Sequence, residues 1–270
     1  MPNKKVLLMG GVGNQLFQIL RAQSHSSQGC AVELLRLSKN KNFIYKLVGF
    51  SNHSEWLNID NLAFRLDLKI REITFHELLL VAINYFLKKV GLRCWFNSPL
   101  KEKSNNLITF LSNGIDVGYF QNSHHFTSIA MNQLILALID ELEIISTPMH
   151  TNIFTIHVRG GDFPINDRIN KYQVNKIIQQ SEDLNLDIKV ITNDSAYAQV
   201  LFSKLNYNFL YSGSSALDDF RFMCLSRNLY VSNSTFSFWA AKCSQSLGGD
   251  QFYGNSDWDF SELLKLRALI

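Results

Sequence analysis

The sequence has few cysteines that could stabilise a fold through a metal ion or a disulfide. Cysteine is scarce, at four in 270 residues: Cys30, Cys94, Cys224 and Cys243. They form no Cys-x-x-Cys pair, and none has a histidine at metal-ligand spacing. This pattern is typical of reduced thiols in a cytosolic protein. It argues against both a zinc-dependent fold and a disulfide-rich secreted domain.

The sequence also has no large excess of positive or negative charge and no long hydrophobic run. The net charge is +3 and 18% of residues are charged, too little to indicate nucleic-acid binding, whereas an anionic small ligand fits. The most apolar run, residues 78–87, is too short to span a bilayer. We expect a buried helix there. The alternative is a helix on a membrane surface, with Lys88, Lys89 and Arg93 toward the lipid headgroups.

No secretory signal is recognised, because residues 1–5 lead straight into an expected strand. We therefore expect a cytoplasmic protein, with peripheral contact at the inner membrane as the alternative. With 46% hydrophobic residues, including 20 phenylalanines, the composition is that of a globular protein with a large aromatic core.

The most informative stretch is 153–163, where a short apolar run is followed by His-Val-Arg-Gly-Gly-Asp at 157–162. Such a run is typical of a buried strand. Open α/β sheets place their ligands at glycine-bearing loops that follow strands. Arg159 adds a planar fork of donors suited to phosphate. Taken alone, the same residues also fit a surface β-turn with an ion pair.

Strands and helices alternate along the chain, which predicts a parallel sheet. The first such unit has a strand at 4–9, a glycine-rich turn at 10–15 and a helix beginning at Leu16. The turn lacks the third glycine of the dinucleotide motif and the Gly-Lys-Ser/Thr of a Walker loop. It is either a tight turn or a ligand cradle containing Asn14 and Gln15. The next strand is expected at 31–37. From there to about residue 75 the hydrophobic residues show neither a clear helical nor a clear strand period.

Three expected strands in the second half, at 153–158, 187–192 and 229–232, each end in polar residues. These residues are His157 and Arg159, then Asn193 and Asp194, then Asn233, Ser234 and Thr235. Because the carboxyl ends of parallel strands share one edge of a sheet, we expect the three groups to converge on one ligand. Hydrogen-bond donors dominate and the third group opens a helix, which favours a phosphate.

Five short blocks share one resemblance. They are Gly10–Gln18 (GGVGNQLFQ), Gly118–Gln121, His157–Phe163, Asp219–Met223 and Asn233–Trp239. In this order and spacing they resemble the motifs of the α-1,2-fucosyltransferases (glycosyltransferase family 11), over nearly the whole chain. Gly160 departs from the family, which has a second arginine there, and Phe163 stands where the family usually has tyrosine.

The resemblance implies an α/β fold of the GT-B type, with two facing Rossmann-like domains built on parallel sheets. A break at Ser146–Pro148 predicts an acceptor-side domain at 1–147 and a GDP-sugar-binding domain at 148–270. The implied activity is inverting, metal-independent transfer of L-fucose from GDP-β-L-fucose to a galactoside 2-hydroxyl. The acceptor would be a lipid-linked oligosaccharide of a bacterial surface glycan, such as an O-antigen. No cofactor is implied.

The resemblance also implies roles for individual residues. Arg159 would stabilise the leaving phosphate, and Asp162 would be the base, a contact to the sugar or a brace for its loop. The implied donor-binding residues are His157, Arg159, Asp194, Asp219, Asn233, Ser234, Thr235 and Ser237. The implied acceptor-side residues are Gly11, Asn14, Gln15 and Gln121. Asp194 fits a helix-capping role equally well.

Two other functions stay open beside this one. The same fold with GDP-colitose or another GDP-deoxyhexose as donor is suggested by Gly160. A non-catalytic nucleotide- or glycan-binding module is the second alternative, and the intact Arg159 and Asp219 argue against it. The single Asp-x-Asp sequence, at 257–259, follows the last expected strand, and we do not expect it to hold a metal ion.

Overall fold

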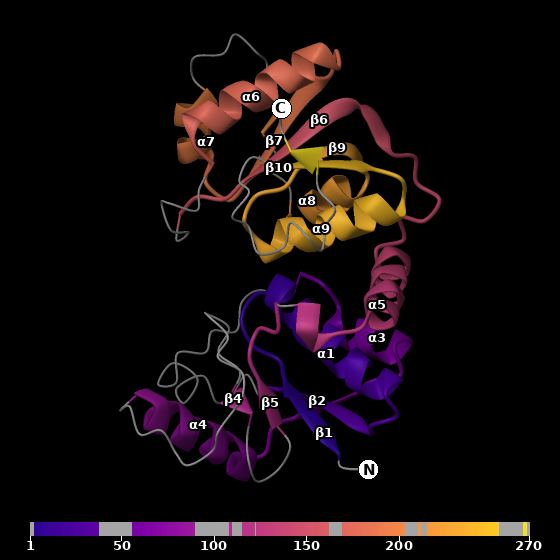
Figure 1. Ribbon diagram of the computed structural model, residues 1–270, viewed down its shortest axis with the longest axis vertical. Coiled ribbons are helices and arrows are strands. Elements are labelled where there is room, and N and C mark those ends of the chain that lie inside the picture. The colour runs from indigo at the N-terminus through magenta and orange to yellow at the C-terminus, as the bar shows by residue number, and fades with distance from the viewer. Residues whose placement is uncertain are drawn as a thin grey trace. The chain divides into compact units, whose positions relative to one another are not determined.

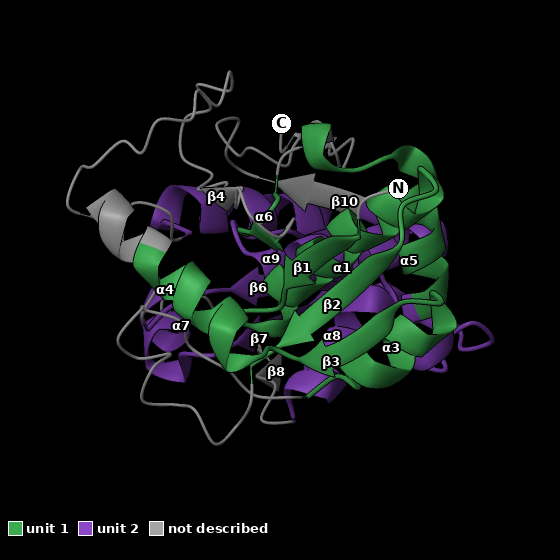
Figure 2. Cartoon of the chain, turned by 90° about the horizontal axis from the view of Figure 1, so that it is seen from below, with its two compact units in different colours: residues 1–137 green, residues 138–270 purple. Residues whose placement is uncertain are grey.

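The computed structural model describes residues 3–37, 56–89, 108–109, 115–121, 123–161, 169–202, 210–211, 215–253 and 267–268. The chain forms two compact units, residues 1–137 and 138–270, and each has a sheet of its own (Figures 1 and 2). The predicted α/β class with parallel sheets is confirmed. The division falls inside helix α5 (Ser128–Glu141), whereas the boundary expected from the sequence lies beyond the end of that helix.

The five-stranded sheet of the first unit has the order β3-β2-β1-β5-β4. The strands are β1 (Lys4–Leu7), β2 (Val32–Arg36), β3 (Lys69–Glu72), β4 (Ile108–Thr109) and β5 (Ile115–Val117). β1 is parallel to both β2 and β5, and β4 is antiparallel to β5. The chain runs outward from β1 through β2 to β3 on one side and then continues with β4 and β5 on the other side, so the strand order reverses beside β1, and open α/β sheets bind ligands at such points.

The helices of the first unit differ in how much of their surface is buried. Those in the described residues are α1 (Val12–Ser27), α3 (Ile59–Arg65), α4 (Phe75–Lys89), the 3-10 turn η2 (Ser123–His125) and most of α5. α1 begins at Val12, four residues before the predicted start at Leu16, so the helix already includes the last part of the expected turn, and 12 of its 16 residues are buried.

Helix α4 contains the most apolar run of the chain. Leu78 and Val81 lie in the core against the sheet, so one face of the expected buried helix is buried. Phe75, Leu79 and Ile83 stay exposed on the other face. Among the described residues, the search for a helix long and apolar enough to cross a bilayer found none.

The six-stranded sheet of the second unit is parallel throughout, in the order β11-β10-β9-β6-β7-β8. The strands are β6 (His150–Val158), β7 (Asp187–Thr192), β8 (Leu210–Tyr211), β9 (Ser226–Tyr230), β10 (Asp250–Tyr253) and β11 (Arg267–Ala268). The strands predicted at 153–158 and 187–192 are confirmed. The strand expected at 229–232 begins and ends earlier, at Ser226 and Tyr230.

β6 lies between β7 and β9, and its last five residues are all buried. Phe154, Ile156 and Val158 pack in one core cluster with apolar residues of α6 (Lys171–Asp183) and α7 (Ser195–Phe202). Two further helices of this unit are α8 (Ala216–Cys224) and α9 (Thr235–Ser246). The core thus fixes the carboxyl end of β6, from which the candidate site begins.

Candidate functional site

The loop after β6 is fastened to the loop after β7. The backbone N–H of Gly160 donates to Asn193 Oδ1 at 3.1 Å, and the N–H of Gly161 donates to Asp194 Oδ2 at 2.8 Å. Gly161 has φ +62°, in the left-handed region that favours glycine. Two of the three polar groups predicted at this edge of the sheet therefore meet.

Gly160 is one of the two positions at which this chain departs from the family motif, and its surroundings explain the glycine. A Cβ atom at this position would lie 2.6 Å from Cβ and 2.7 Å from Oδ2 of Asp194. Such contacts are far inside van der Waals distance, so a larger residue fits only if the two loops separate. The loop therefore has no room for a second arginine beside Arg159.

Asp194 uses both carboxylate oxygens within the protein. Oδ1 accepts from the N–H of Tyr197 at 3.0 Å and caps α7, while Oδ2 accepts from Gly161. Its own N–H donates to Thr192 Oγ1 at 2.9 Å. The helix-capping alternative is therefore what the structure contains, together with a brace of the β6 loop, and the donor-binding role of Asp194 stays a prediction.

His157 connects β6 to the third polar group. Its side chain is 4% exposed, and Nδ1 shares a hydrogen bond of 2.6 Å with Ser232 Oγ and a further one with Ser237 Oγ. The two hydroxyl groups are themselves 2.8 Å apart. Burial, together with the nearby charge of Arg159, lowers the pKa of His157 to about 3. The imidazole is therefore neutral at physiological pH.

Arg159 and the start of α9 supply the donors. Arg159 is half-buried, directly beyond the buried end of β6. Ser234 is the N-cap residue of α9, yet its side chain makes no capping hydrogen bond. Thr235 is the first helical residue, and Asn233 before it is exposed. A guanidinium and a helix N-terminus both suit a phosphate.

Asp219 has a different environment, in the first turn of α8. Burial lowers the pKa of Lys189 on β7, and the negative charge of Asp219 opposes this shift. The ammonium of Lys189 lies 3.4 Å from the centre of the Phe222 ring, on which His150 stacks with ring centres 4.2 Å apart. No pattern in the sequence predicts this cluster, because its members come from three separate elements.

The first unit holds its glycine-rich turn together with neutral amides. Gln15 Nε2 donates to the carbonyl oxygen of Gly10 at 2.9 Å, and Gln121 Nε2 donates to Asn14 Oδ1 at 3.0 Å. The latter bond joins the first and second motif blocks. Gly10 has φ +74°, which the tight turn requires. Gly11 is the N-cap residue of α1.

Gln18 is the residue of this motif whose role the sequence did not reveal. It is fully buried. Its Oε1 accepts from the N–H of Met9 at 2.8 Å, and its Nε2 donates to the carbonyl oxygen of Gly118 at 2.9 Å. One side chain thus satisfies backbone groups of both loops, which gives a physical reason for the two blocks to occur together.

A buried charged cluster supports the same two segments from behind. Asp116 on β5 accepts from Arg21 Nε at 3.1 Å and pairs with His25 Nε2 at 2.9 Å. Burial raises the pKa of Asp116, but the His25 hydrogen bond and the Arg21 charge outweigh it, so the net shift is downward. Arg21 also donates to the carbonyl oxygen of His125 at 2.9 Å. The cluster holds β5 against α1.

Two predicted features lie outside the described residues: the catalytic Asp162, with its neighbour Phe163, and the Asp-x-Asp sequence at 257–259. Their roles stay predictions. In the part of the chain that is described, the structure contains no group of three or more histidine, cysteine, aspartate or glutamate side chains suited to a metal ion.

Polar, glycine-bearing loops at the carboxyl ends of parallel strands are where open α/β sheets place their ligands. No family model matches the chain. The chain is 24% identical to the α-1,2-colitosyltransferase of Escherichia coli over 266 residues, covering 87% of this chain and 85% of that protein. This similarity confirms, at the level of the family, the resemblance to the α-1,2-fucosyltransferases, and with it the prediction of a glycosyltransferase.

Two E. coli structures are similar over most of this chain. The ADP-heptose lipopolysaccharide heptosyltransferase II has a TM-score of 0.47 and 13% identity, covering 99% of this chain and 90% of its own. The heptosyltransferase WaaC with ADP has a TM-score of 0.43 and 9% identity, covering 98% and 91%. Likeness at this level establishes no shared function, and the proposed function does not rest on it.

Proposed function

We propose that this chain is an inverting glycosyltransferase that moves a deoxyhexose from a GDP-sugar to a hydroxyl group of a galactoside in a bacterial glycan. L-Fucose from GDP-β-L-fucose is the first candidate, with the 2-hydroxyl as acceptor. The family similarity supports this class of reaction. The main structural support for the proposed site is the position of Arg159. It lies beyond the buried end of β6, on a loop whose backbone N–H groups are hydrogen-bonded to the loop after β7.

In the proposed reaction the acceptor oxygen attacks the anomeric carbon from the side opposite the leaving group. The bond between that carbon and the β-phosphate oxygen breaks, and its electron pair leaves with GDP. Arg159 would stabilise the growing negative charge, helped by Ser234 and Thr235 at the start of α9. These fixed hydrogen-bond donors would stabilise the leaving group without a metal ion. The proton of the acceptor hydroxyl would pass to a carboxylate, for which Asp162 is the candidate.

His157 fits a positioning role in this scheme. A buried imidazole with a pKa of about 3 stays neutral and cannot act as a base near pH 7. With Nδ1 engaged by Ser232 and Ser237, only Nε2 is left for the guanine contact that the family resemblance implies. Its main effect would be to hold the β6 loop against the start of α9.

Colitose is the second candidate sugar, favoured by the name of the E. coli relative and by Gly160, which lacks the side chain of the family's second arginine. Colitose is fucose without its 3-hydroxyl. A site that hydrogen-bonds a hydroxyl rejects the analogue lacking it by about 10⁴–10⁵, whereas a site built for the smaller sugar rejects the hydroxylated one by only about 10². The ratio of the two rates therefore separates the two assignments.

We also propose a lipid-linked acceptor and peripheral contact with a membrane surface. The exposed apolar residues Phe75, Leu79 and Ile83 on α4, followed in sequence by Lys88 and Lys89, support this contact. Co-sedimentation with vesicles of anionic lipid should fall when Phe75 and Leu79 are both replaced by serine. Equal co-sedimentation of the variant and the wild type would contradict the contact.

The direct test measures transfer and hydrolysis with GDP-fucose, GDP-colitose, GDP-mannose and UDP-galactose, all in EDTA. We expect turnover of a GDP-deoxyhexose by the wild type and a roughly 10²–10³-fold lower kcat in Arg159→Ala. Arg227→Ala, at an exposed arginine on β9, is the matched control and should keep full activity. Activity only with UDP-galactose and a metal ion, or an unchanged Arg159→Ala variant, would refute the proposal.

A further inference from the structure

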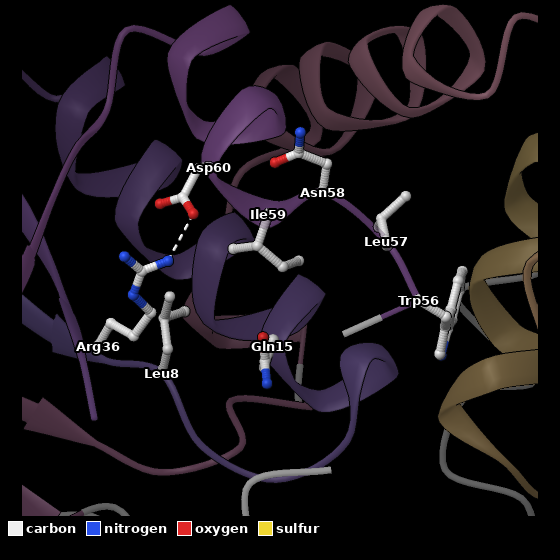
Figure 3. A pocket seen from close by; sticks show the side chains of 8 residues that line it. All are labelled: Leu8, Gln15, Arg36, Trp56, Leu57, Asn58, Ile59 and Asp60. Atoms are coloured by element: carbon white, nitrogen blue, oxygen red, sulfur yellow. Dashed lines mark hydrogen bonds and ion pairs between the residues drawn. The ribbon is translucent and has the colours of Figure 1, made fainter. Parts of the chain in front are cut away.

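The first unit contains a cavity in which Gln15 is the one lining residue that belongs to the motif blocks. Its volume is about 350 Å³, and it is lined by Leu8, Gln15, Arg36, Trp56, Leu57, Asn58, Ile59 and Asp60 (Figure 3). Small-ligand sites have volumes of about 300–1,000 Å³, so this one has room for a small unit and not for a long chain. It opens beside the carboxyl ends of β1 and β2, next to the glycine-rich turn.

The segment 56–60 forms one wall, and Leu57 and Asn58 anchor it. Leu57 is buried, and Asn58 caps α3 by accepting from the N–H of Asn61 at 3.0 Å. Trp56, which is half-buried, precedes these anchors. In Figure 3 its indole lies on one side of the cavity and the Arg36–Asp60 pair on the other, with Gln15 and Ile59 between them.

The polar side of the cavity is an ion pair of Arg36 and Asp60, whose charges cancel. Arg36 Nη1 donates to Asp60 Oδ2 at 2.5 Å, and the two side chains remain 42% and 56% exposed. An exposed ion pair contributes little to stability. Within the described residues Asp60 is the ion-pair partner of Arg36, and both side chains line the cavity.

Gln15 connects this cavity to the glycine-rich turn. Its Nε2 is engaged by the carbonyl oxygen of Gly10 at 2.9 Å, which fixes the amide and leaves Oε1 as its other polar atom. The lining thus combines one aromatic plane, a fixed amide and a paired cation and anion. Each has a counterpart on a pyranose ring, whose C–H face stacks on an aromatic plane and whose hydroxyls both donate and accept.

We propose that this cavity binds a neutral sugar unit of the acceptor glycan. Arg36 alone would favour a carboxylate or a phosphate, but the carboxylate of Asp60 beside it repels anions. Vicinal hydroxyls suit the pair, because one donates to Asp60 while its neighbour accepts from Arg36. The proposal rests on the proposed function in one respect, namely that the acceptor is a glycan.

The experiment measures binding by saturation-transfer NMR with the full chain in the presence of GDP. The two probes are methyl β-D-galactoside and methyl β-D-galacturonide, which differ in a single carboxylate. Wild type should bind the neutral galactoside more tightly. Trp56→Ala should weaken galactoside binding about tenfold, and the isosteric Asp60→Asn should shift selectivity toward the galacturonide by about three- to tenfold. Lys69→Gln, which removes an exposed lysine paired with Glu33 outside the lining, is the control and should change neither.

Three outcomes would overturn the proposal: tighter binding of the galacturonide by wild type, galactoside binding unchanged in Trp56→Ala, or unchanged selectivity in Asp60→Asn. A parallel titration with GDP separates this from failure of the proposed function. A wild type that binds no GDP refutes the glycosyltransferase assignment, whereas one that binds GDP but no galactoside refutes only the cavity. Because Asp60→Asn preserves size and shape, it remains decisive if Trp56→Ala does not fold.

Discussion

The two glycine-bearing loops of this chain are built from different chemistry. The turn at 10–15 in the first unit is held by neutral amides, among them the fully buried Gln18. The loop at 159–161 in the second unit is held by the amide of Asn193 together with the carboxylate of Asp194, and it lies beside a buried neutral imidazole. In the first unit the motif residues chiefly shape the backbone, and the charged groups of the cavity come from outside the motif. In the second unit the motif itself carries the charge.

This difference has a consequence for the response to pH. Amide hydrogen bonds do not titrate, so the turn of the first unit should keep its geometry over a wide pH range. The second unit instead contains the buried, neutral imidazole of His157, whose protonation depends on pH. Variants at matched positions of the two loops separate these two modes of support.

The largest expected effect is on the stability of the first unit. Replacing Gln18 with leucine leaves the N–H of Met9 and the carbonyl of Gly118 buried without partners, which should lower the free energy of unfolding by about 2–4 kcal/mol. Urea unfolding monitored by circular dichroism measures this. The control is Gln179→Leu on α6, where an exposed glutamine donates to Asp183 at 3.0 Å. Equal losses in both variants would show that Gln18 is not a framework residue.

The second prediction concerns pH and the second unit. An unfolded histidine titrates near pH 6.5 and His157 in the folded protein near 3, so between these values the unfolded state binds more protons. Stability should therefore fall as the pH falls through this range, and His157 should contribute about 2–3 kcal/mol of the loss between pH 7 and 4.5. In His157→Gln this part of the loss should disappear.

Comparing the urea midpoints of both proteins at the two pH values isolates the effect of His157, because carboxylates such as Asp116 titrate in both and cancel. Identical pH profiles would mean that the imidazole protonates without cost to the fold. The two glycine-bearing loops would then not differ in how their stability responds to pH.

The third prediction compares one glycine from each loop. Gly160→Ala places a methyl group 2.6 Å from Cβ of Asp194, so it should cost about 1–3 kcal/mol and lower transfer activity as the loop shifts. Gly11→Ala places its methyl group in open space at φ −68°, and should change stability by less than about 0.5 kcal/mol. Thermal unfolding of the two variants decides this. Similar melting temperatures would contradict the close approach of Asp194.

Much of the second unit was predictable from the sequence, because the signals are local. A buried strand at 153–158, a helix-alternating pattern and polar residues at strand ends together imply convergence at one edge of the sheet. The close contact of Asp194 with Gly160 was not predictable, since it joins side chain and backbone from different strands. The sequence showed only that the second arginine is missing, while the structure shows what fills its place.

The first unit was harder to predict where the pattern is weak. α3 is only seven residues long, and β3 reads Lys-Ile-Arg-Glu, with no alternation of buried and exposed residues. β3 is held instead by ion pairs, such as Arg71 with Glu33 at 2.9 Å and with Glu77 at 2.7 Å. Because such contacts have no period along the sequence, neither this strand nor the cavity beside residues 56–60 could be foreseen. The amides of the glycine-rich turn were recognised, but not their partners.

The smallest expected effect is on stability at the cavity, and it is the one on which the sugar-binding test depends. Asp60→Asn removes an exposed ion pair with Arg36 and a negative charge from the first turn of α3. Each contributes at most about 1 kcal/mol in exposed positions, so thermal unfolding should shift by only a few degrees. A much larger loss of stability would mean that the ion pair supports the fold. Arg36 and Asp60 would then have a structural role, as Gln18 has. A small loss with altered sugar selectivity would place them with Arg159, among the residues that face a ligand.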